Sequence, residues 1–276
     1  MPEARSAANR TAQRIRAYST PAIILRRADF GEADRVLTIL TPEHGLKRVL
    51  AKGVRRVTSR KAGHLELFAR AQLLLARGRQ LDLVTQAELL EPHRALREDL
   101  QRGALAHYIC ELAERFASAE TDSAALFHLV AETLLALCEA ADPLLIARAY
   151  ELHLLTLEGY RPQLFMCALT NQPLEIDQEP TRTRAWFSPS SGGAVREACL
   201  AQARDAIPTP RVALEALRLM HTRALTALVT QRFSAELHEA IARVLRAYTA
   251  HVLEQQPRSA EVMQQIADHL RFGAGA

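Results

Sequence analysis

The chain lacks any long apolar run. Among its 276 residues no segment approaches the roughly 18 consecutive apolar residues of a membrane span, and the opening stretch has no apolar core of a secretory signal. Cysteine is scarce as well: Cys110, Cys138, Cys167 and Cys199 lie far apart, which predicts reduced thiols rather than a disulfide framework. We therefore expect a cytoplasmic protein.

Catalytic signatures are also missing. No Gly-x-x-x-x-Gly-Lys-Ser/Thr phosphate loop occurs, which argues against an ATP-driven motor. His64-x-Glu66 is not followed by the Pro-Cys-x-x-Cys of zinc deaminases, and His238-Glu239 lacks the second histidine of His-Glu-x-x-His. The sequence therefore predicts a binding protein without a cofactor, not an enzyme.

Positive charge, in contrast, is concentrated in one place. Between Lys47 and Lys61 the chain reads KRVLAKGVRRVTSRK, with seven basic side chains and no acidic one. Residues 19–95 carry fourteen basic and eight acidic side chains, whereas residues 96–276 carry seventeen basic and twenty-two acidic ones. This asymmetry indicates a basic part that contacts nucleic acid or a membrane surface and an acidic part that contacts protein. For the basic run alone, a solvated loop that binds nothing is the alternative.

The first third of the chain has the pattern of a small β-barrel. Short apolar or alternating runs, separated by turn residues, predict the five strands Ala22–Arg27, Arg35–Thr41, Lys47–Lys52, Ala69–Arg77 and Leu81–Leu89. The OB-fold is the five-stranded barrel most often used to hold single-stranded nucleic acid. An SH3-like barrel is the structural alternative, which the periodicity does not separate from it.

After His93 the pattern becomes helical, so the predicted fold class is α+β: an N-terminal five-stranded OB-fold barrel followed by an all-α helical domain with a loop insertion. Capping residues predict helices from Thr121 or Asp122 to about Ala141, from Asp142-Pro143 to Gly159, from Thr209-Pro210 to near Arg232, from Ser234 to about Gln255, and from Ser259 to Leu270.

The predicted domains are a mobile basic tail at 1–18, an OB-fold at 19–92 and a helical domain at 93–270 with an insertion at 163–208. The insertion is rich in proline and glycine, which predicts either a functional loop or a small module of its own. We expect its Trp186-Phe187 pair to anchor the loop rather than to stack on a base.

Taken together, these features resemble the RecO family of bacterial recombination mediators. The matching strings are Asp34-Arg35-Val36-Leu37-Thr38-Ile39-Leu40-Thr41 with Gly45, Ala51-Lys52-Gly53-Val54-Arg55-Arg56 with Ser59-Arg60 and Gly63, Leu67-Phe68, Gly159-Tyr160-Arg161-Pro162, and Phe187-Ser188-Pro189 with Gly192-Gly193. The combination of the Ala-Lys-Gly-Val-Arg-Arg element with the distant Gly-Tyr-Arg-Pro turn is the most specific part.

The resemblance implies a DNA repair protein of the RecF pathway, associated with the nucleoid. Such a protein binds single- and double-stranded DNA, anneals complementary strands, and works with RecR to help RecA displace single-strand binding protein. The expected phosphate contacts are Arg35, Lys47, Arg48, Lys52, Arg55, Arg56, Arg60 and Lys61, with Arg55, Arg56 and Arg60 favoured. Because neighbours along a strand point to opposite faces, Lys47 and Arg48 share one groove only if a bulge intervenes.

The resemblance also implies that the helical domain receives the acidic tail of single-strand binding protein, for which Arg115, Arg148, Arg218 and Arg223 are candidates. Many members of the family hold zinc with two Cys-x-x-Cys pairs. Here these pairs read Cys167-Ala168-Leu169-Thr170 and Arg196-Glu197-Ala198-Cys199, and a structural zinc site normally requires four ligands. We therefore predict no zinc, and the resemblance implies that the insertion at 163–208 is a degenerate zinc-finger-like module.

Two other functions fit the same residues. One is a helical adaptor or regulator whose basic barrel contacts RNA or protein rather than DNA. The other is a metal-dependent nuclease whose acidic residues converge only in three dimensions.

Overall fold

The computed structural model describes residues 17–117, 121–179 and 181–253. Most of the predicted basic tail at 1–18, and the whole predicted helix from Ser259 to Leu270, lie outside these residues. The chain divides into two compact units: residues up to 97 together with 117–131, and residues 98–116 together with those from 132 onward. No helix within the described ranges is long and apolar enough to cross a membrane.

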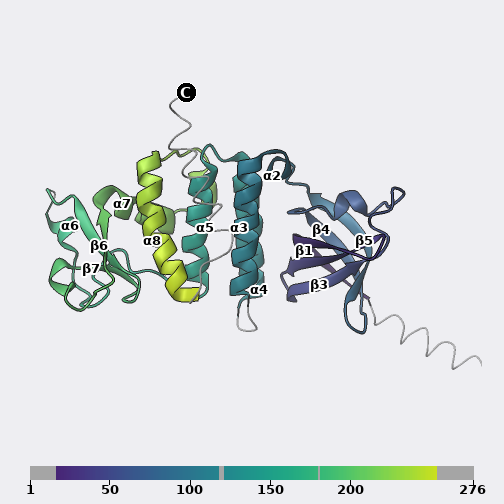
Figure 1. Ribbon diagram of the computed structural model, residues 1–276, viewed down its shortest axis with the longest axis horizontal. Helices are drawn as coiled ribbons and strands as arrows, with labels where there is room; N and C mark the ends of the chain where they lie inside the picture. Colours follow the sequence, from purple (N-terminus) through teal and green to yellow (C-terminus); the bar gives the residue numbers. More distant parts are fainter. Residues whose placement is uncertain (1–16, 118–120, 180, 254–276) are drawn as a thin grey trace, which may run out of the picture. The chain divides into compact units, whose positions relative to one another are not determined.

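The first unit contains a closed barrel with the strand order β1-β2-β3-β5-β4 (Figure 1). Neighbouring strands are antiparallel except β3 and β5, which pair in parallel. This arrangement confirms the predicted OB-fold, and each predicted strand overlaps an observed one. The strands are β1 (Ala17–Phe30), β2 (Asp34–Thr41), β3 (Gly45–Ala51), β4 (Arg70–Ala76) and β5 (Asp82–Glu91).

Every second side chain along the strands points inward, and these side chains fill the inside of the barrel. Leu37 and Ile39 of β2, Val49 and Ala51 of β3, and Leu73 of β4 are fully buried in one apolar cluster. These residues stand two apart because successive side chains of a strand point to opposite faces. Bulges in β1 and β5 interrupt the register and allow the long strands to curve around this core.

Helices dominate the rest of the chain. In the second unit α5 is central, because it contacts α3, α7 and α8, and Figure 1 shows α3, α5 and α8 side by side. Every residue of α5 from Leu144 to Leu152 is buried, which explains why this segment is apolar nearly all round. The helices are α2 (Ala95–Glu98), α3 (Leu100–Phe116), α4 (Ser123–Glu139), α5 (Pro143–Leu157), α7 (Arg211–Thr222) and α8 (Ala235–Leu253).

Three predicted helix starts are confirmed by their capping bonds. Asp122, Asp142 and Ser234 each accept a hydrogen bond from the backbone N–H three residues ahead, over 3.0, 3.1 and 3.3 Å. Such bonds satisfy backbone donors that have no partner inside the helix. Beyond the end of α5, Gly159 has a φ of +83°, a left-handed conformation that glycine adopts without steric cost.

The helix predicted from Thr209-Pro210 to near Arg232 is wrong at both ends. Thr209 belongs to a strand and its hydroxyl donates to the Ile207 carbonyl, so it does not cap α7. The helix stops at Thr222, and a separate 3₁₀ turn, η3 (Leu225–Leu228), follows. The backbone N–H of Ala141 donates to the carbonyl of Val229 at 2.8 Å. This tertiary hydrogen bond competes with continuation of the helix, and local sequence does not reveal it.

The predicted insertion holds a small sheet rather than a loop without regular structure. Its strands are β6 (Arg184–Ser188), β7 (Gly193–Val195) and β8 (Ile207–Pro210), in the order β7-β6-β8, accompanied by α6 (Glu175–Gln178) and the 3₁₀ turn η2 (Glu197–Cys199). Phe187 is buried and its ring lies 5.5 Å from the ring of Tyr248 on α8. This aromatic contact anchors the sheet to the helices.

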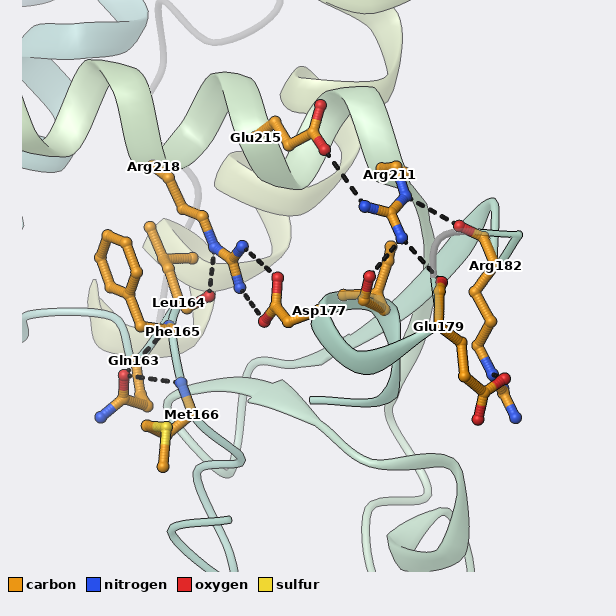
Figure 2. A network of polar contacts seen from close by, with 11 residues as sticks. Gln163, Leu164, Phe165, Met166, Asp177, Glu179, Arg182, Arg211, Glu215 and Arg218 are labelled. Carbon is orange, nitrogen blue, oxygen red and sulfur yellow. Dashed lines mark hydrogen bonds and ion pairs between the residues drawn. The ribbon is translucent and has the colours of Figure 1, made fainter. Parts of the chain in front are cut away.

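Two arginines of α7 tie the insertion down, as Figure 2 shows. Arg218 pairs with both carboxylate oxygens of Asp177 at 2.7 and 2.8 Å. Arg211 donates to the backbone carbonyls of Ile176, Glu179 and Arg182. A planar guanidinium offers five donors in a fixed fork, so a single side chain can fix several carbonyls at once.

A buried ion pair lies inside the helical unit. Arg148 and Glu151, both on α5 and at most 2% exposed, are 2.9 Å apart, and the Tyr108 hydroxyl of α3 donates to the same carboxylate at 2.6 Å. Nε and Nη2 of Arg148 and Oε2 of Glu151 have no partner among the described residues. Both charged residues lie on α5, so the hydrogen bond from Tyr108 is what connects the pair to α3. Loss of either charge alone would leave the other uncompensated in this interior.

Asp142 connects α5, which it caps, to α8 and to the segment just before α8. Its second carboxylate oxygen accepts hydrogen bonds from the backbone N–H of Phe233, at 3.0 Å, and from His238 Nε2 on α8, at 2.8 Å. Burial by itself raises the pKa of the Asp142 carboxyl, but the bonds from His238, Phe233 and Leu145 outweigh burial and hold the pKa below its ordinary value. The carboxylate therefore stabilises the fold in its ionised form.

We predict that Asp142→Ala lowers the free energy of unfolding at neutral pH by about 3 kcal/mol, since a cap and a buried charge-assisted bond are lost together. Because the folded pKa is lowered, this contribution is complete above the unfolded pKa and disappears as the pH falls through the folded pKa. Urea unfolding at neutral and acidic pH measures both effects. Asp122→Ala, which removes an exposed cap, is the matched control and should cost about 1 kcal/mol.

Candidate nucleic-acid interface

The basic loop between β3 and β4 is fixed to the barrel at its start. Val54 packs in the barrel core at 2% exposure. The Gly53 N–H donates to Asp34 Oδ1 at 2.7 Å, and the Arg55 N–H donates to the Ala33 carbonyl at 2.9 Å. Gly53 has a φ of +64°, which favours glycine at this turn. The loop therefore begins at a defined place beside the β1–β2 turn.

Short turns continue the loop. The N–H groups of Arg56, Ser59 and His64 each donate to the carbonyl three residues earlier, at 3.2, 2.9 and 3.1 Å. A 3₁₀ turn, η1 (Ala62–His64), ends it, and Leu65 then enters the barrel core. Since these backbone groups bond within the loop, its long side chains are the groups presented to solvent.

The structure divides the eight predicted phosphate contacts into two sets of four. In the first set the cationic group already has a partner. Arg35 Nε and Arg55 Nη2 lie 3.0 and 3.4 Å from the two carboxylate oxygens of Asp29 in β1. Two guanidinium groups share one carboxylate, so part of their charge is neutralised within the protein.

Lys47 and Lys61 complete this first set. Lys47 Nζ lies 3.1 Å from Asp82, and Lys61 Nζ donates to the carbonyl of Val84 at 2.9 Å. Val84 borders the bulge of β5, where the backbone register shifts. Both lysines therefore bind β5 to neighbouring parts of the barrel, which gives them a structural role that a count of charges does not reveal.

The second set is exposed and uncompensated. Among the described residues, no hydrogen bond or ion pair engages the charged groups of Arg48, Lys52, Arg56 and Arg60. Arg48 lies on β3 between Lys47 and Val49, whose side chain faces the core, and the β2–β3 register is unbroken. Arg48 therefore points outward while Lys47 lies on the opposite side of the strand, as the alternation predicts.

Lys47 belongs to a polar cluster at one end of the barrel. The Tyr18 hydroxyl of β1 donates to Asp82 at 2.6 Å, and Lys47 Nζ lies 5.3 Å from the centre of the Tyr18 ring. Burial alone raises the pKa of Asp82, but bonds from Tyr18 and Lys47 outweigh it and lower the pKa. The cluster joins β1, β3 and β5 where β3 and β5 share just two paired positions, Val49↔Asp82 and Leu50↔Leu83.

Sequence reasoning missed two exposed arginines on the β4–β5 loop. Arg77, whose guanidinium lies 5.7 Å from the centre of the Tyr18 ring, and Arg79 flank Gly78. A Cβ at Gly78 would lie 1.9 Å from the Leu81 carbonyl oxygen, so this tight turn requires glycine. In OB-folds the β1–β2 and β4–β5 loops border the binding face. The sequence signal that could have revealed these two arginines is the Arg77-Gly78-Arg79 run between two predicted strands.

The four candidate docking arginines of the helical part have unequal positions. Arg148 is buried against Glu151, which excludes it from a protein-docking surface. Arg218 is engaged by Asp177 (Figure 2), and Arg115 lies 3.0 Å from Glu111. Arg223 is exposed just beyond α7. Of these candidates, Arg223 presents its charge to solvent most directly.

The residues of the insertion do not fit a zinc ion. Cys167 and Cys199 lie side by side, but Thr170 and Arg196 stand at the other two positions of the Cys-x-x-Cys pattern. The Arg196 guanidinium pairs with Glu175 at 2.9 Å. In the part of the chain that the structure describes, no group of three or more His, Cys, Asp or Glu side chains is placed to hold a metal.

The fold and the basic loop define a class: an OB-fold with an uncompensated cationic surface, joined to a helical domain that carries a small sheet. Comparison with known proteins identifies the family within this class. Residues 15–93 match the family model "Recombination protein O N terminal", and residues 97–261 match "Recombination protein O C terminal".

Curated relatives agree with the family models. The chain is 41% identical over 263 residues to the DNA repair protein RecO of Roseiflexus sp. (strain RS-1), covering 95% of this chain and 90% of the relative. It is 37% identical over 253 residues to that of Desulforudis audaxviator, covering 91% and 98%. It is 35% identical over 242 residues to that of Dehalococcoides mccartyi (strain 195), covering 88% and 93%. The chain belongs to the RecO family of DNA repair proteins.

We predict that Asp82→Ala lowers the free energy of unfolding by about 2 kcal/mol, because Tyr18 and Lys47 lose a shared partner. Thermal or urea unfolding followed by circular dichroism measures this loss. Glu88→Ala, an exposed position on the same strand, should change the stability by less than about 0.5 kcal/mol. Equal stability of both variants would show that the cluster does not hold the barrel closed.

Proposed function

We propose that this chain is a recombination mediator that binds single- and double-stranded DNA through its barrel and anneals complementary strands. The observation that carries the proposal is a set of exposed cations that no group in the described part of the chain compensates: Arg48, Lys52, Arg56 and Arg60. Each phosphate that such a side chain neutralises releases a condensed counterion, and this release supplies affinity without regard to base sequence. Membership of a DNA repair family supports DNA as the polyanion.

The geometry of β3 supports a path for a single strand. The strand spans Gly45–Ala51, which is about 20 Å at the usual rise per residue. Arg48 lies outward near its middle, and the basic loop with Lys52, Arg56 and Arg60 leaves from its end. A backbone lying along the outer face of β3 would therefore meet uncompensated cations at the middle of the strand and at the end where the basic loop begins.

The same proposal assigns no catalytic step to the protein. The helical domain would contact RecR and the acidic tail of single-strand binding protein, so that RecA can be loaded onto coated strands at the nucleoid. Arg223 is the first candidate for the tail, because Arg148 is buried and Arg218 is bound to Asp177.

Salt dependence tests the DNA-binding surface. If the four uncompensated cations contact phosphates of a single strand, log K should fall with log salt at a slope of about −2.8, and Arg56→Ala/Arg60→Ala should reduce it to about −1.4. Fluorescence anisotropy with a labelled oligonucleotide measures both. Arg204→Ala/Arg232→Ala removes the same charge from exposed positions of the second unit and should leave the slope unchanged. Equal slopes in all three proteins would contradict this surface.

Annealing tests the function. Two complementary labelled strands, coated with the cognate single-strand binding protein, should anneal rapidly with the native chain and without nucleotide. Annealing should be lost with Arg56→Glu/Arg60→Glu and kept with Arg204→Glu/Arg232→Glu. The strands should stay intact with magnesium or manganese, whereas cleavage would indicate the nuclease. Failure to anneal, with tighter binding of RNA than of DNA of equal length, would support the RNA-binding regulator.

A further inference from the structure

Two cysteines of the insertion meet although 31 residues separate them in the sequence. The sulfur atoms of Cys167 and Cys199 are 3.9 Å apart, a distance at which one thiol can donate a weak hydrogen bond to the other sulfur. Both side chains are buried, at 1% and 6% exposure. Thr170 and Arg196 do not complete a metal site, so any chemistry of Cys167 and Cys199 must come from the two thiols themselves.

The backbone around Cys167 is arranged to hold a negative sulfur. The Cys167 carbonyl accepts from the Asn171 N–H at 2.8 Å, which closes a tight turn, and the Arg196 N–H points at the Cys167 sulfur over 3.4 Å. Burial alone raises the pKa of the Cys167 thiol, but bonds from the Thr170 side chain and from backbone N–H groups outweigh it and lower the pKa to about 7.

The pKa of the Cys199 thiol shifts in the opposite direction. Burial and the neighbouring Cys167 sulfur raise the pKa of its thiol. The pair is therefore asymmetric: one sulfur carries negative charge readily near neutral pH, and the other keeps its proton. A thiolate beside a protonated thiol is the arrangement in which one cysteine attacks an oxidant and its neighbour then resolves the product.

We propose that Cys167 and Cys199 form a reversible disulfide that closes the insertion in place of a metal ion. With hydrogen peroxide as the oxidant, the Cys167 thiolate attacks one oxygen, an S–O bond forms, the O–O bond breaks and hydroxide leaves. Cys199 then loses its proton and attacks the sulfur of this sulfenic acid, forming the S–S bond and releasing the second oxygen as hydroxide. The two thiol protons convert both hydroxides to water, and a dithiol reductant reverses the reaction.

The bond would join the turn that precedes α6 to η2 and enclose β6 and β7 in one covalent loop. In the reduced form this segment is held by noncovalent contacts such as those of Arg211 and Arg218 (Figure 2). Closure of such a loop restricts the unfolded chain, so the oxidised protein should unfold at a higher temperature than the reduced protein.

A peptide map tests the proposal on the full native chain. The protein is treated with hydrogen peroxide, alkylated after denaturation without reductant, and digested with trypsin. Cleavage after Arg182, Arg196 and Arg204 places the two cysteines on different peptides. We expect one cross-linked pair joining residues 197–204 to the peptide that ends at Arg182, a fall in free thiols from four to two, and reversal by dithiothreitol.

Cys110 and Cys138 are internal controls and should remain fully alkylated. Cys199→Ser should leave Cys167 as a sulfenic acid that dimedone captures, whereas Cys167→Ser should react much more slowly. The map of the native chain decides the question even if a variant does not fold. Free Cys167 and Cys199 after peroxide has oxidised the methionines would overturn the proposal, as would zinc bound to these two cysteines in the purified protein.

Discussion

The short parallel seam between β3 and β5 is the constraint on which the basic face of the barrel depends. Two paired positions join these strands, so the backbone alone holds the barrel closed weakly at this place. Asp82, shared by Tyr18 and Lys47, supplies side-chain bonds across the gap. If the seam opened, β3 would stay paired with β2 but would no longer be joined to β5, so the strand that carries Arg48 would be held from one side only.

A cation in the sequence is therefore not the same as a cation available to a ligand. The run from Lys47 to Lys61 looks uniform when charges are counted, yet half of the predicted contacts are already bonded within the protein. Arg35 and Arg55 share Asp29, which lies in β1 and is distant in the sequence from Arg55. Among the described residues, the uncompensated charges belong to side chains that no acidic group contacts in the folded chain, and this is a property of tertiary structure.

Local signals predicted most of the fold. Short apolar or alternating runs between turn residues predicted every barrel strand, and the capping residues Asp122, Asp142 and Ser234 predicted three helix starts, because these signals act within a few residues. The predictions that were wrong or incomplete depend instead on contacts between residues far apart in the sequence. The sequence predicts Thr209 as a cap, but this residue lies in the strand β8, whose pairing with β6 is set by residues far away in the sequence. In the candidate site the basic loop was found, but the internal partners of Lys47 could not be, because Asp82 approaches it only when the barrel closes.

The buried pair of Arg148 and Glu151 also limits how this protein can change over generations. Replacing either residue alone leaves an uncompensated charge in the helical core, whereas replacing both with apolar residues of similar volume can be neutral or even stabilising. Tyr108 would have to change in step, because its hydroxyl depends on the same carboxylate. Descendants that lose this pair should therefore lose Arg148, Glu151 and the Tyr108 hydroxyl together. This requires either a rare simultaneous change or a protein stable enough to tolerate the loss of one partner first.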